Sequence, residues 1–310
     1  MINAYENFIW FNGVVEDRDD PKKLGRCKVR CLGYHTSDKS QLPTSDLPWS
    51  YPIMPINSTS MNGIGPSPLG PVEGTWVFGF FRDGKSAQEP IMMGTMPGIP
   101  QSAPNPEAGF NDPSGKYPKD GFTGEADTNR LARNEKIDET IVKSKQDSLD
   151  TMEIATGIGS QDTVSEPEVP YAAQYPFNKV YESESGHIVE VDDTEGSERI
   201  NIHHKSGTFI EIHPDGSMVR KVSGKNYEVR AGDDNLHVKG VMNITVQGNS
   251  SIYTLGTSYT KTIGNHTIEV DGDYQLNVKG KVLINGGDGG SNISMDASSI
   301  KERAGSIHLN

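Results

Sequence analysis

The last third of the chain alternates apolar and polar residues within a strict period of eight. Between residues 216 and 280 every glycine follows the previous one by eight positions, and this window contains no other glycine. The positions two before and four after these glycines are mostly Val, Thr, Leu or Ile, and on an extended strand they lie on one face. The repeat glycines are Gly216, Gly224, Gly232, Gly240, Gly248, Gly256, Gly264, Gly272 and Gly280. The apolar positions are Leu236, Val238, Ile244, Val246, Ile252, Ile268, Val270, Leu276, Val278 and Ile284.

This repeat predicts strands whose apolar face one chain cannot bury by itself. Burying an aliphatic side chain stabilises by about 1.5–3 kcal/mol, but only against a facing surface. Three copies wound about one axis would supply that surface and pair each other's strand edges. We therefore expect an intertwined trimeric β-helix over residues 232–310, after an irregular β lead-in segment over 179–231. A single-chain solenoid is the alternative, although known solenoid periods of about six and nine residues do not match a period of eight.

Residues 1–100 contain short β-type runs separated by turn signals. The runs are FIWFNGVVE, GRCKVRCLGY, WSYPIMPI, GTWVFGFFRDG and EPIMMGTM. Such strands with glycine-rich connections predict a small barrel of the OB type. Cys27 and Cys31 lie on one run, where four residues of strand span roughly 13 Å, too far for a disulfide. We expect both to be small core residues.

Residues 101–178 have the composition of an acidic linker punctuated by proline. Only a stretch of about 129–154 has helical periodicity, with Leu131, Ile137 and Ile141 spaced for one weak face. That stripe is too thin to form a core alone, so the helix is expected to be marginal or docked on another element. Its acidic residues are expected to form a solvated face, and they are Glu135, Asp138, Glu139 and Asp147.

Composition and charge argue against several classes of function for this protein. The formal net charge of −13 argues against a nucleic-acid binder that works by neutralising phosphates. No run approaches the roughly 18 apolar residues of a membrane-spanning helix. The start, MINAYENFIW, lacks the basic and apolar regions of a secretory signal, which predicts a protein made and assembled in a cytoplasm. Apolar residues make up only 33%, which favours a mainly β fold over a large helical enzyme.

The octads resemble the repeat of the central spike of contractile phage tails, in the tail-associated lysozyme family of T-even-type phages. The spike of bacterial type VI secretion is similar in plan. The segment ESESGHIVEVDDTEGSERINIHHKSGTFIEIHPDGS is similar to the start of that spike, and WFNGVVEDRDDPKKLGRCKVRCLGYH with GPVEGTWVFGFF is similar to the family's OB-fold domain. The resemblance implies an N-terminal OB-fold barrel and a C-terminal intertwined trimeric β-helix, and in this chain we expect the extended linker with one short helix to join them.

The chain departs from the best-known family members, which carry a lysozyme domain between barrel and spike, with a Glu acid and an Asp partner. Here about eighty residues occupy that place, roughly half of what a lysozyme fold needs. His187, His203 and His204 are expected to serve strand pairing and turns rather than catalysis. We therefore expect a non-enzymatic protein without a cofactor. Two alternatives remain open: a spike that also hydrolyses peptidoglycan through an unrecognised site in the linker, and, more weakly, a receptor-binding fibre.

The resemblance implies a virion protein of the tail baseplate that pierces the host outer envelope on tail contraction. Its implied partners are two further copies of the chain, a trimeric baseplate hub protein at the end of the tail tube and, transiently, the host envelope, with no nucleic-acid specificity. Some relatives hold an axial iron with a His-x-His pair from each chain, whereas this chain ends AGSIHLN, with His308 alone. Ile307 and Leu309 alternate with His308 and are expected to form an apolar platform. We expect a small tip protein of the proline-alanine-alanine-arginine type to cap it, with a metal at His308 as the weaker alternative.

Overall fold

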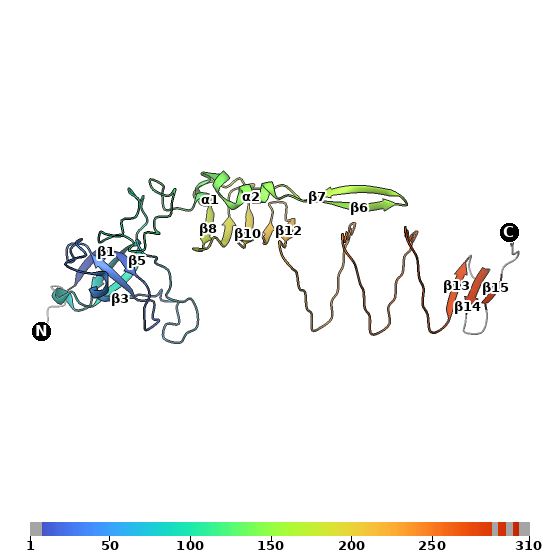
Figure 1. Ribbon diagram of the computed structural model, residues 1–310, viewed down its shortest axis with the longest axis horizontal. Coiled ribbons are helices and arrows are strands. Elements are labelled where there is room, and N and C mark those ends of the chain that lie inside the picture. The colour runs from blue at the N-terminus through green and yellow to red at the C-terminus, as the bar shows by residue number, and fades with distance from the viewer. Residues whose placement is uncertain (1–7, 287–290, 296–299, 304–310) are drawn as a thin grey trace. The chain divides into compact units, whose positions relative to one another are not determined.

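The chain folds mainly into β-structure (Figure 1). The computed structural model describes residues 8–286, 291–295 and 300–303. Two compact units are present, residues 1–149 with 167–233, and residues 150–166 with 234–310. None of the helices in the described ranges is both long enough and apolar enough to span a membrane.

A closed five-stranded barrel forms the first part of the chain. Its strand order is β1-β2-β3-β5-β4, antiparallel except where β3 pairs parallel with β5. The strands are β1 (Ile9–Asp17), β2 (Cys27–Cys31), β3 (Trp49–Pro52), β4 (Trp76–Phe81) and β5 (Pro90–Thr95), and the connections contain the 3-10 helices η1 (Thr44–Asp46) and η2 (Gly84–Ser86). This closed order confirms the OB-type barrel expected over residues 1–100.

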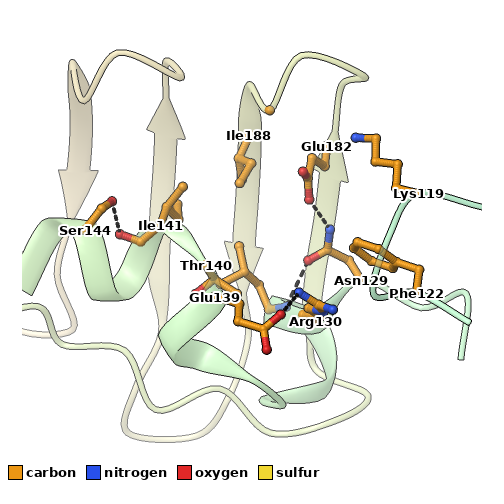
Figure 2. Close-up of a pocket in the computed structure, with 12 residues that line it drawn as sticks. Lys119, Phe122, Asn129, Arg130, Glu139, Thr140, Ile141, Ser144, Glu182 and Ile188 are labelled. Atoms are coloured by element: carbon orange, nitrogen blue, oxygen red, sulfur yellow. Dashed lines mark hydrogen bonds and ion pairs between the residues drawn. The ribbon is translucent and has the colours of Figure 1, made fainter. Parts of the chain in front are cut away.

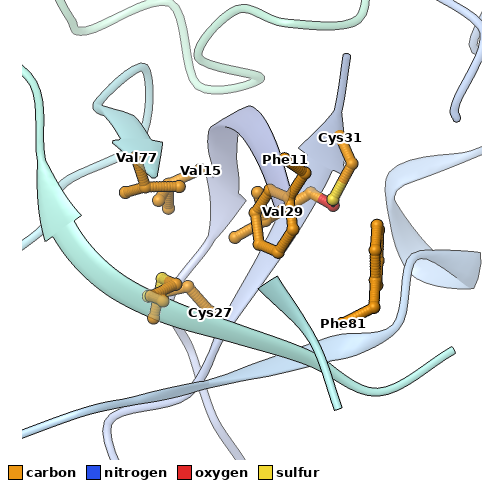
Figure 3. Packing of buried hydrophobic residues seen from close by; sticks show 8 residues of the cluster. Phe11, Val15, Cys27, Val29, Cys31, Val77 and Phe81 are labelled. Carbon is orange, nitrogen blue, oxygen red and sulfur yellow. The ribbon is translucent and has the colours of Figure 1, made fainter. Parts of the chain in front are cut away.

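The barrel core comes from alternate residues of these strands (Figure 3). It consists of Phe11, Val15, Cys27, Val29, Cys31, Val77, Phe81 and Met92. Both cysteines are free and buried, and burial raises the pKa of each thiol to about 12. At neutral pH they therefore hold almost no thiolate and behave as small apolar residues. Gly79 on β4 lies so close to β5 that an added Cβ would stand 2.0 Å from the Ile91 carbonyl oxygen.

A fully buried ion pair ties the barrel to the start of the linker. Arg30 Nε lies 2.6 Å from Glu16 Oε1, and both side chains are 0% exposed. The Glu16 carboxylate also accepts from Thr44 Oγ1 at 2.7 Å and from the Phe110 amide at 2.8 Å. Burial alone would raise the pKa of Glu16, but these donors together hold it below its ordinary value. A Cβ at Gly109 would lie 2.5 Å from Arg30 Nε, so only glycine fits there.

The linker contains three short helical segments in place of one helix over about 129–154. They are α1 (Arg130–Arg133), the 3-10 helix η3 (Ile137–Glu139) and α2 (Ile141–Asp147). Asn134 and Lys136 have φ values of 54° and 48°, and residues in this left-handed conformation do not continue a right-handed helix. The segments are docked, because Leu131 and Val142 pack against Ile188 in one buried cluster.

The linker helices lie against a second sheet, an antiparallel meander of five strands. Consecutive strands pair, so the order β12-β11-β10-β9-β8 follows the sequence. The strands are β8 (Asn178–Glu182), β9 (Ile188–Asp192), β10 (Arg199–His203), β11 (Phe209–Ile212) and β12 (Met218–Lys221).

The second unit contains two further antiparallel elements. β6 (Thr151–Gly157) and β7 (Ser160–Ser165) form a hairpin, and β13 (Val282–Gly286), β14 (Ser291–Met295) and β15 (Ile300–Arg303) form a three-stranded sheet. Residues 223–281 lie in neither helix nor strand. The intertwined β-helix expected from residue 232 onward is thus not formed within one chain.

We predict that the buried Glu16–Arg30 pair stabilises the barrel far more than an exposed pair does. Replacing Arg30 by Met should cost about 3–5 kcal/mol of unfolding free energy, because the Glu16 carboxylate stays buried without its cation. Arg82→Met is the matched control, since Arg82 and Glu89 are 62% and 50% exposed and their loss should cost at most about 1 kcal/mol. Urea denaturation followed by tryptophan fluorescence measures this, because the three tryptophans are Trp10, Trp49 and Trp76. Equal losses in the two variants would contradict it.

Candidate assembly surfaces

The β8–β12 sheet has an inverted pattern, with its polar face buried and its apolar face exposed. The apolar residues pair with one another across the strands, Val191 and Ile212 with Ile200, and Val189 and Ile210 with Ile202. Their exposed fractions range from 38% to 54% for Val189, Val191, Ile200, Ile202, Ile210 and Ile212. An apolar face of this size on a soluble protein indicates an interaction surface. The alternation in HIVEVD, RINIH and FIEI signalled these residues, but our sequence analysis had not singled them out.

The buried polar face holds a network of charges under the linker. Arg199 donates to Glu190 at 2.6 Å and to Glu211 at 2.7 Å. Lys145 of α2 lies 2.5 Å from the other Glu211 oxygen, and these four side chains are at most 3% exposed. Burial alone would raise the pKa of Glu211, but Lys145 and Arg199 hold it below its ordinary value. Because a buried charge without its partner is costly, the linker and the sheet form one interdependent unit.

The octads run as an extended chain whose side chains are exposed throughout residues 223–281. Figure 1 shows straight arms joined by repeated reversals of direction. The ten apolar positions expected to form a core are between 44% and 94% exposed. No hydrogen bond between two backbone groups joins residues 224–281 to another described residue. The apolar stripe thus lies on a stretch of backbone outside any helix or strand.

The repeat glycines mark the corners of this chain. From Gly224 to Gly280 each glycine and the residue before it form a bend, so the bends recur every eight residues. None of these glycines has a positive φ, in contrast to Gly216 with φ of 81°. An added Cβ would meet nothing within 4 Å. An unusual backbone angle is therefore not what requires glycine at these positions after Gly216.

The β6–β7 hairpin contacts the octads within the second unit. The Gly159 amide at its turn donates to both oxygens of Glu269, at 3.1 and 3.0 Å. The Thr245 hydroxyl donates to the Glu153 carbonyl. Glu269 and Thr245 both lie at positions that alternate with the apolar positions of the repeat. The hairpin therefore contacts the polar side chains of the octads and leaves the apolar stripe uncovered.

The acidic residues of the linker helices lie on the surface. Glu135, Asp138, Glu139 and Asp147 are all exposed. Three of them make ion pairs within the linker, Glu135 with Arg133, Glu139 with Arg130, and Asp147 with Lys143.

A pocket of about 340 Å³ lies between the linker helices and the edge of the sheet (Figure 2). Its two carboxylates are both hydrogen-bonded within the chain. Glu182 accepts from Asn129 Nδ2 at 2.6 Å, and Glu139 accepts from Arg130 at 2.6 Å. Phe122 stacks under the Arg130 guanidinium, 4.2 Å from ring centre to Cζ. In the described ranges no group of three or more His, Cys, Asp or Glu residues is arranged to hold a metal ion.

The outer surface of the barrel carries a cluster of aromatic side chains on β1 and β4. Trp10 stacks on Phe78 with ring centroids 4.9 Å apart, and Phe8 lies 4.8 Å from Phe80. Phe8 and Trp10 are nevertheless 48% and 45% exposed. The alternation in FIWF and WVFGFF places these rings opposite the core, a signal that the sequence analysis left unused.

The expected tip residues Ile307, His308 and Leu309 lie outside the described residues, so the platform and its cap stay predictions.

We predict that the sheet loses stability as the pH falls from about 6.5 to about 4. Burial, followed by the nearby Lys145 charge, lowers the pKa of His203 to about 4, while Glu211 and Glu190 oppose this shift. In that window the unfolded chain binds the proton and the folded chain does not, so stability falls by up to about 1.4 kcal/mol per pH unit. His203→Gln should flatten this dependence, and His204→Gln, at an exposed position, should not.

The measurement is the protection of backbone amides in β9–β11 against hydrogen exchange, expressed relative to intrinsic exchange at each pH. A slope that His203→Gln leaves unchanged would contradict the assignment.

Comparisons with known proteins agree with the barrel. Residues 33–173 match the family described as the Gp5 N-terminal OB domain. The chain is 46% identical over 272 residues to Protein Gp5 of Vibrio phage KVP40, across 79% of this chain and 64% of that protein. It is 50% identical over 118 residues to the pre-baseplate central spike protein Gp5 of Enterobacteria phage T4, across 36% of this chain and 20% of that protein. The chain thus matches less than two thirds of the length of either relative. It carries a Gp5 N-terminal OB domain and is a relative of the phage Gp5 proteins.

Proposed function

We propose that the chain is the central spike of a contractile phage tail baseplate, a homotrimer that pierces the host outer envelope on tail contraction. Its octads wind with those of two other copies into a triple-stranded β-helix. The mechanism is mechanical, because a shaft held by many interchain hydrogen bonds and an apolar core is stiff along its axis. The protein assembles in the host cytoplasm and resides in the virion. The printed name of the T4 relative and the identity to both Gp5 proteins support this role.

The observation that carries the proposal is the octad chain, whose side chains are exposed along residues 223–281 and which lies in neither helix nor strand there. An isolated extended strand is not stable in water. Two other copies of the chain would pair with the backbone of the octads and would also cover their apolar stripe. A bend at every glycine gives each chain a corner at the same interval, which suits winding about a common axis. The exposed apolar face of the β8–β12 sheet provides a second surface for the same trimerisation.

We propose that the spike is not an enzyme. The linker carboxylates Glu135, Glu139 and Asp147 are engaged in ion pairs, and Glu182 is held by Asn129. A glycosidase acid needs a raised pKa and a free face toward the substrate. The charged cluster around Glu190 and Glu211 is covered by the linker, so a polysaccharide does not reach it.

We propose further that the barrel binds a trimeric hub protein at the end of the tail tube. The aromatic cluster of Phe8, Trp10, Phe78 and Phe80 suits such a contact, because exposed aromatic residues are enriched at protein interfaces. Acidic and basic residues nearly balance in residues 1–100, which fits a protein partner better than a nucleic acid. A tip protein at Ile307 and Leu309 completes the proposed assembly.

The oligomeric mass and one pair of variants test the trimer. Light scattering should give three times the chain mass of 33.8 kDa. Gly248→Val should lower the trimer yield sharply, because its methyl groups would overpack the approach of a neighbouring chain by about 1–3 kcal/mol in each of three copies. Asn249→Val, at the adjacent polar position, is the matched control and should leave the yield unchanged. A monomer at micromolar concentration would overturn the architecture, and equal yields of the two variants would show that the glycine period has no packing role.

Peptidoglycan digestion tests the non-enzymatic assignment. The purified trimer should give no clearing zone in a gel containing peptidoglycan, under conditions where an equal amount of a known lysozyme clears it. A clearing zone that disappears on Glu139→Gln or Glu182→Gln would instead establish the linker pocket as a hydrolase site.

A further inference from the structure

The longest uncharged segment of the barrel domain includes β3 and most of the connection from β3 to β4. Residues 47–72 contain no Lys, Arg, Asp, Glu or His, although charged residues make up 23% of the chain. Depletion of charge with enrichment of Met and other apolar residues is the composition of interface cores.

The tip of this connection, residues 55–66, forms a small preformed projection that we call the finger. An antiparallel bridge joins Thr59 to Ile64, and the Thr59 hydroxyl donates to the Ile64 carbonyl. Met61 has a φ of 74°, a left-handed conformation that costs energy for a long side chain. Ile56 and Met61 are 105% and 103% exposed, so they contact nothing else in their own chain. An uncharged projection that carries two fully exposed apolar side chains is available to a partner.

The base of the same connection borders an apolar groove of about 280 Å³, which we call the Met groove. Met54, Leu69, Val77, Met92 and Met93 contribute to its lining, and no charged residue lines it. Its volume lies just below the usual range for small-molecule sites, so it suits one or two inserted side chains better than a whole ligand. Methionine side chains adapt to the shape of an inserted apolar group.

We propose that the finger of one copy inserts Met61 and Ile56 into the Met groove of the next copy. Repeated around the spike, this contact closes the three barrels into a ring. The inference rests on the proposed homotrimer and adds to it a specific contact between the N-terminal domains.

The occupant is a second copy because the chain itself carries both complementary parts. The finger and the groove are both uncharged, and methionine occurs in both, once in the finger and three times in the groove, whereas the rest of the barrel surface mixes acids, bases and aromatic rings. The finger does not fill its own groove, since Ile56 and Met61 are fully exposed. A contact between two different patches is head-to-tail, and such contacts close only if the rotation between copies is fixed. A three-chain spike fixes that rotation at one third of a turn, which prevents open filaments.

Cysteine cross-linking of the full chain tests the contact. Met61→Cys is combined with Met93→Cys, and the protein is treated with a short bismaleimide. The native Cys27 and Cys31 do not interfere, because burial raises the pKa of each to about 12. The control combines Met93→Cys with Lys22→Cys, which lies on the exposed turn between β1 and β2. Tryptophan fluorescence checks that both variants keep the barrel fold, and light scattering gives the mass of each sample.

The expected result is a ladder of covalent dimer and trimer on a denaturing gel, at least about tenfold stronger than in the control, because facing thiols have a high effective concentration. A trimeric sample that gives only monomer or cross-links within one chain would overturn the finger contact and leave the proposed spike intact. A monomeric sample would overturn both. Cross-linking of Met61→Cys to a co-expressed hub protein, without cross-links between copies, would also overturn it and identify the hub as the occupant.

Discussion

The octads impose one constraint on which the rest of the protein depends: a long segment outside helix and strand whose apolar side chains are exposed. Within residues 223–281 every residue is exposed, and bends recur at each glycine from Gly224 to Gly280. An apolar stripe of this length is costly to leave in water, because aliphatic side chains are stabilised when they are covered. The segment makes sense as one part of a larger shaft, and this is the basis of the proposed spike.

The β8–β12 sheet also leaves apolar side chains exposed, but its backbone is paired within the chain. It turns the charged residues Glu190, Arg199 and Glu211 toward the linker and leaves Ile200 and Ile202 on the open face. An ordinary two-layer domain would bury the apolar face and expose the polar one. Here the linker neutralises the charged face through Lys145, and the apolar face is left exposed. The linker is therefore a structural cover for the sheet as well as a connection along the chain.

The barrel is stabilised independently of these surfaces. Its core is complete within one chain. The Glu16 carboxylate, which pairs with Arg30, also accepts a hydrogen bond from the Phe110 amide at the start of the linker. An independently stable barrel can present the aromatic cluster on one side and the finger on another. In the proposed spike, this division separates the part that contacts other proteins of the tail from the part that forms the shaft.

The sequence by itself determined the barrel, the repeat and the relation to phage spikes, because these depend on local alternation and on glycine spacing. The period of eight located every corner of the octad chain, and the strand pattern of residues 1–100 located the core cysteines. Only the tertiary structure decided how the linker folds, since Asn134 and Lys136 break the expected helix and Lys145 finds its partner 66 residues away in Glu211. It also decided which face of the β8–β12 sheet is buried. Alternation shows that a strand has two faces, but which face is covered depends on what packs against it, and that contact is distant in sequence.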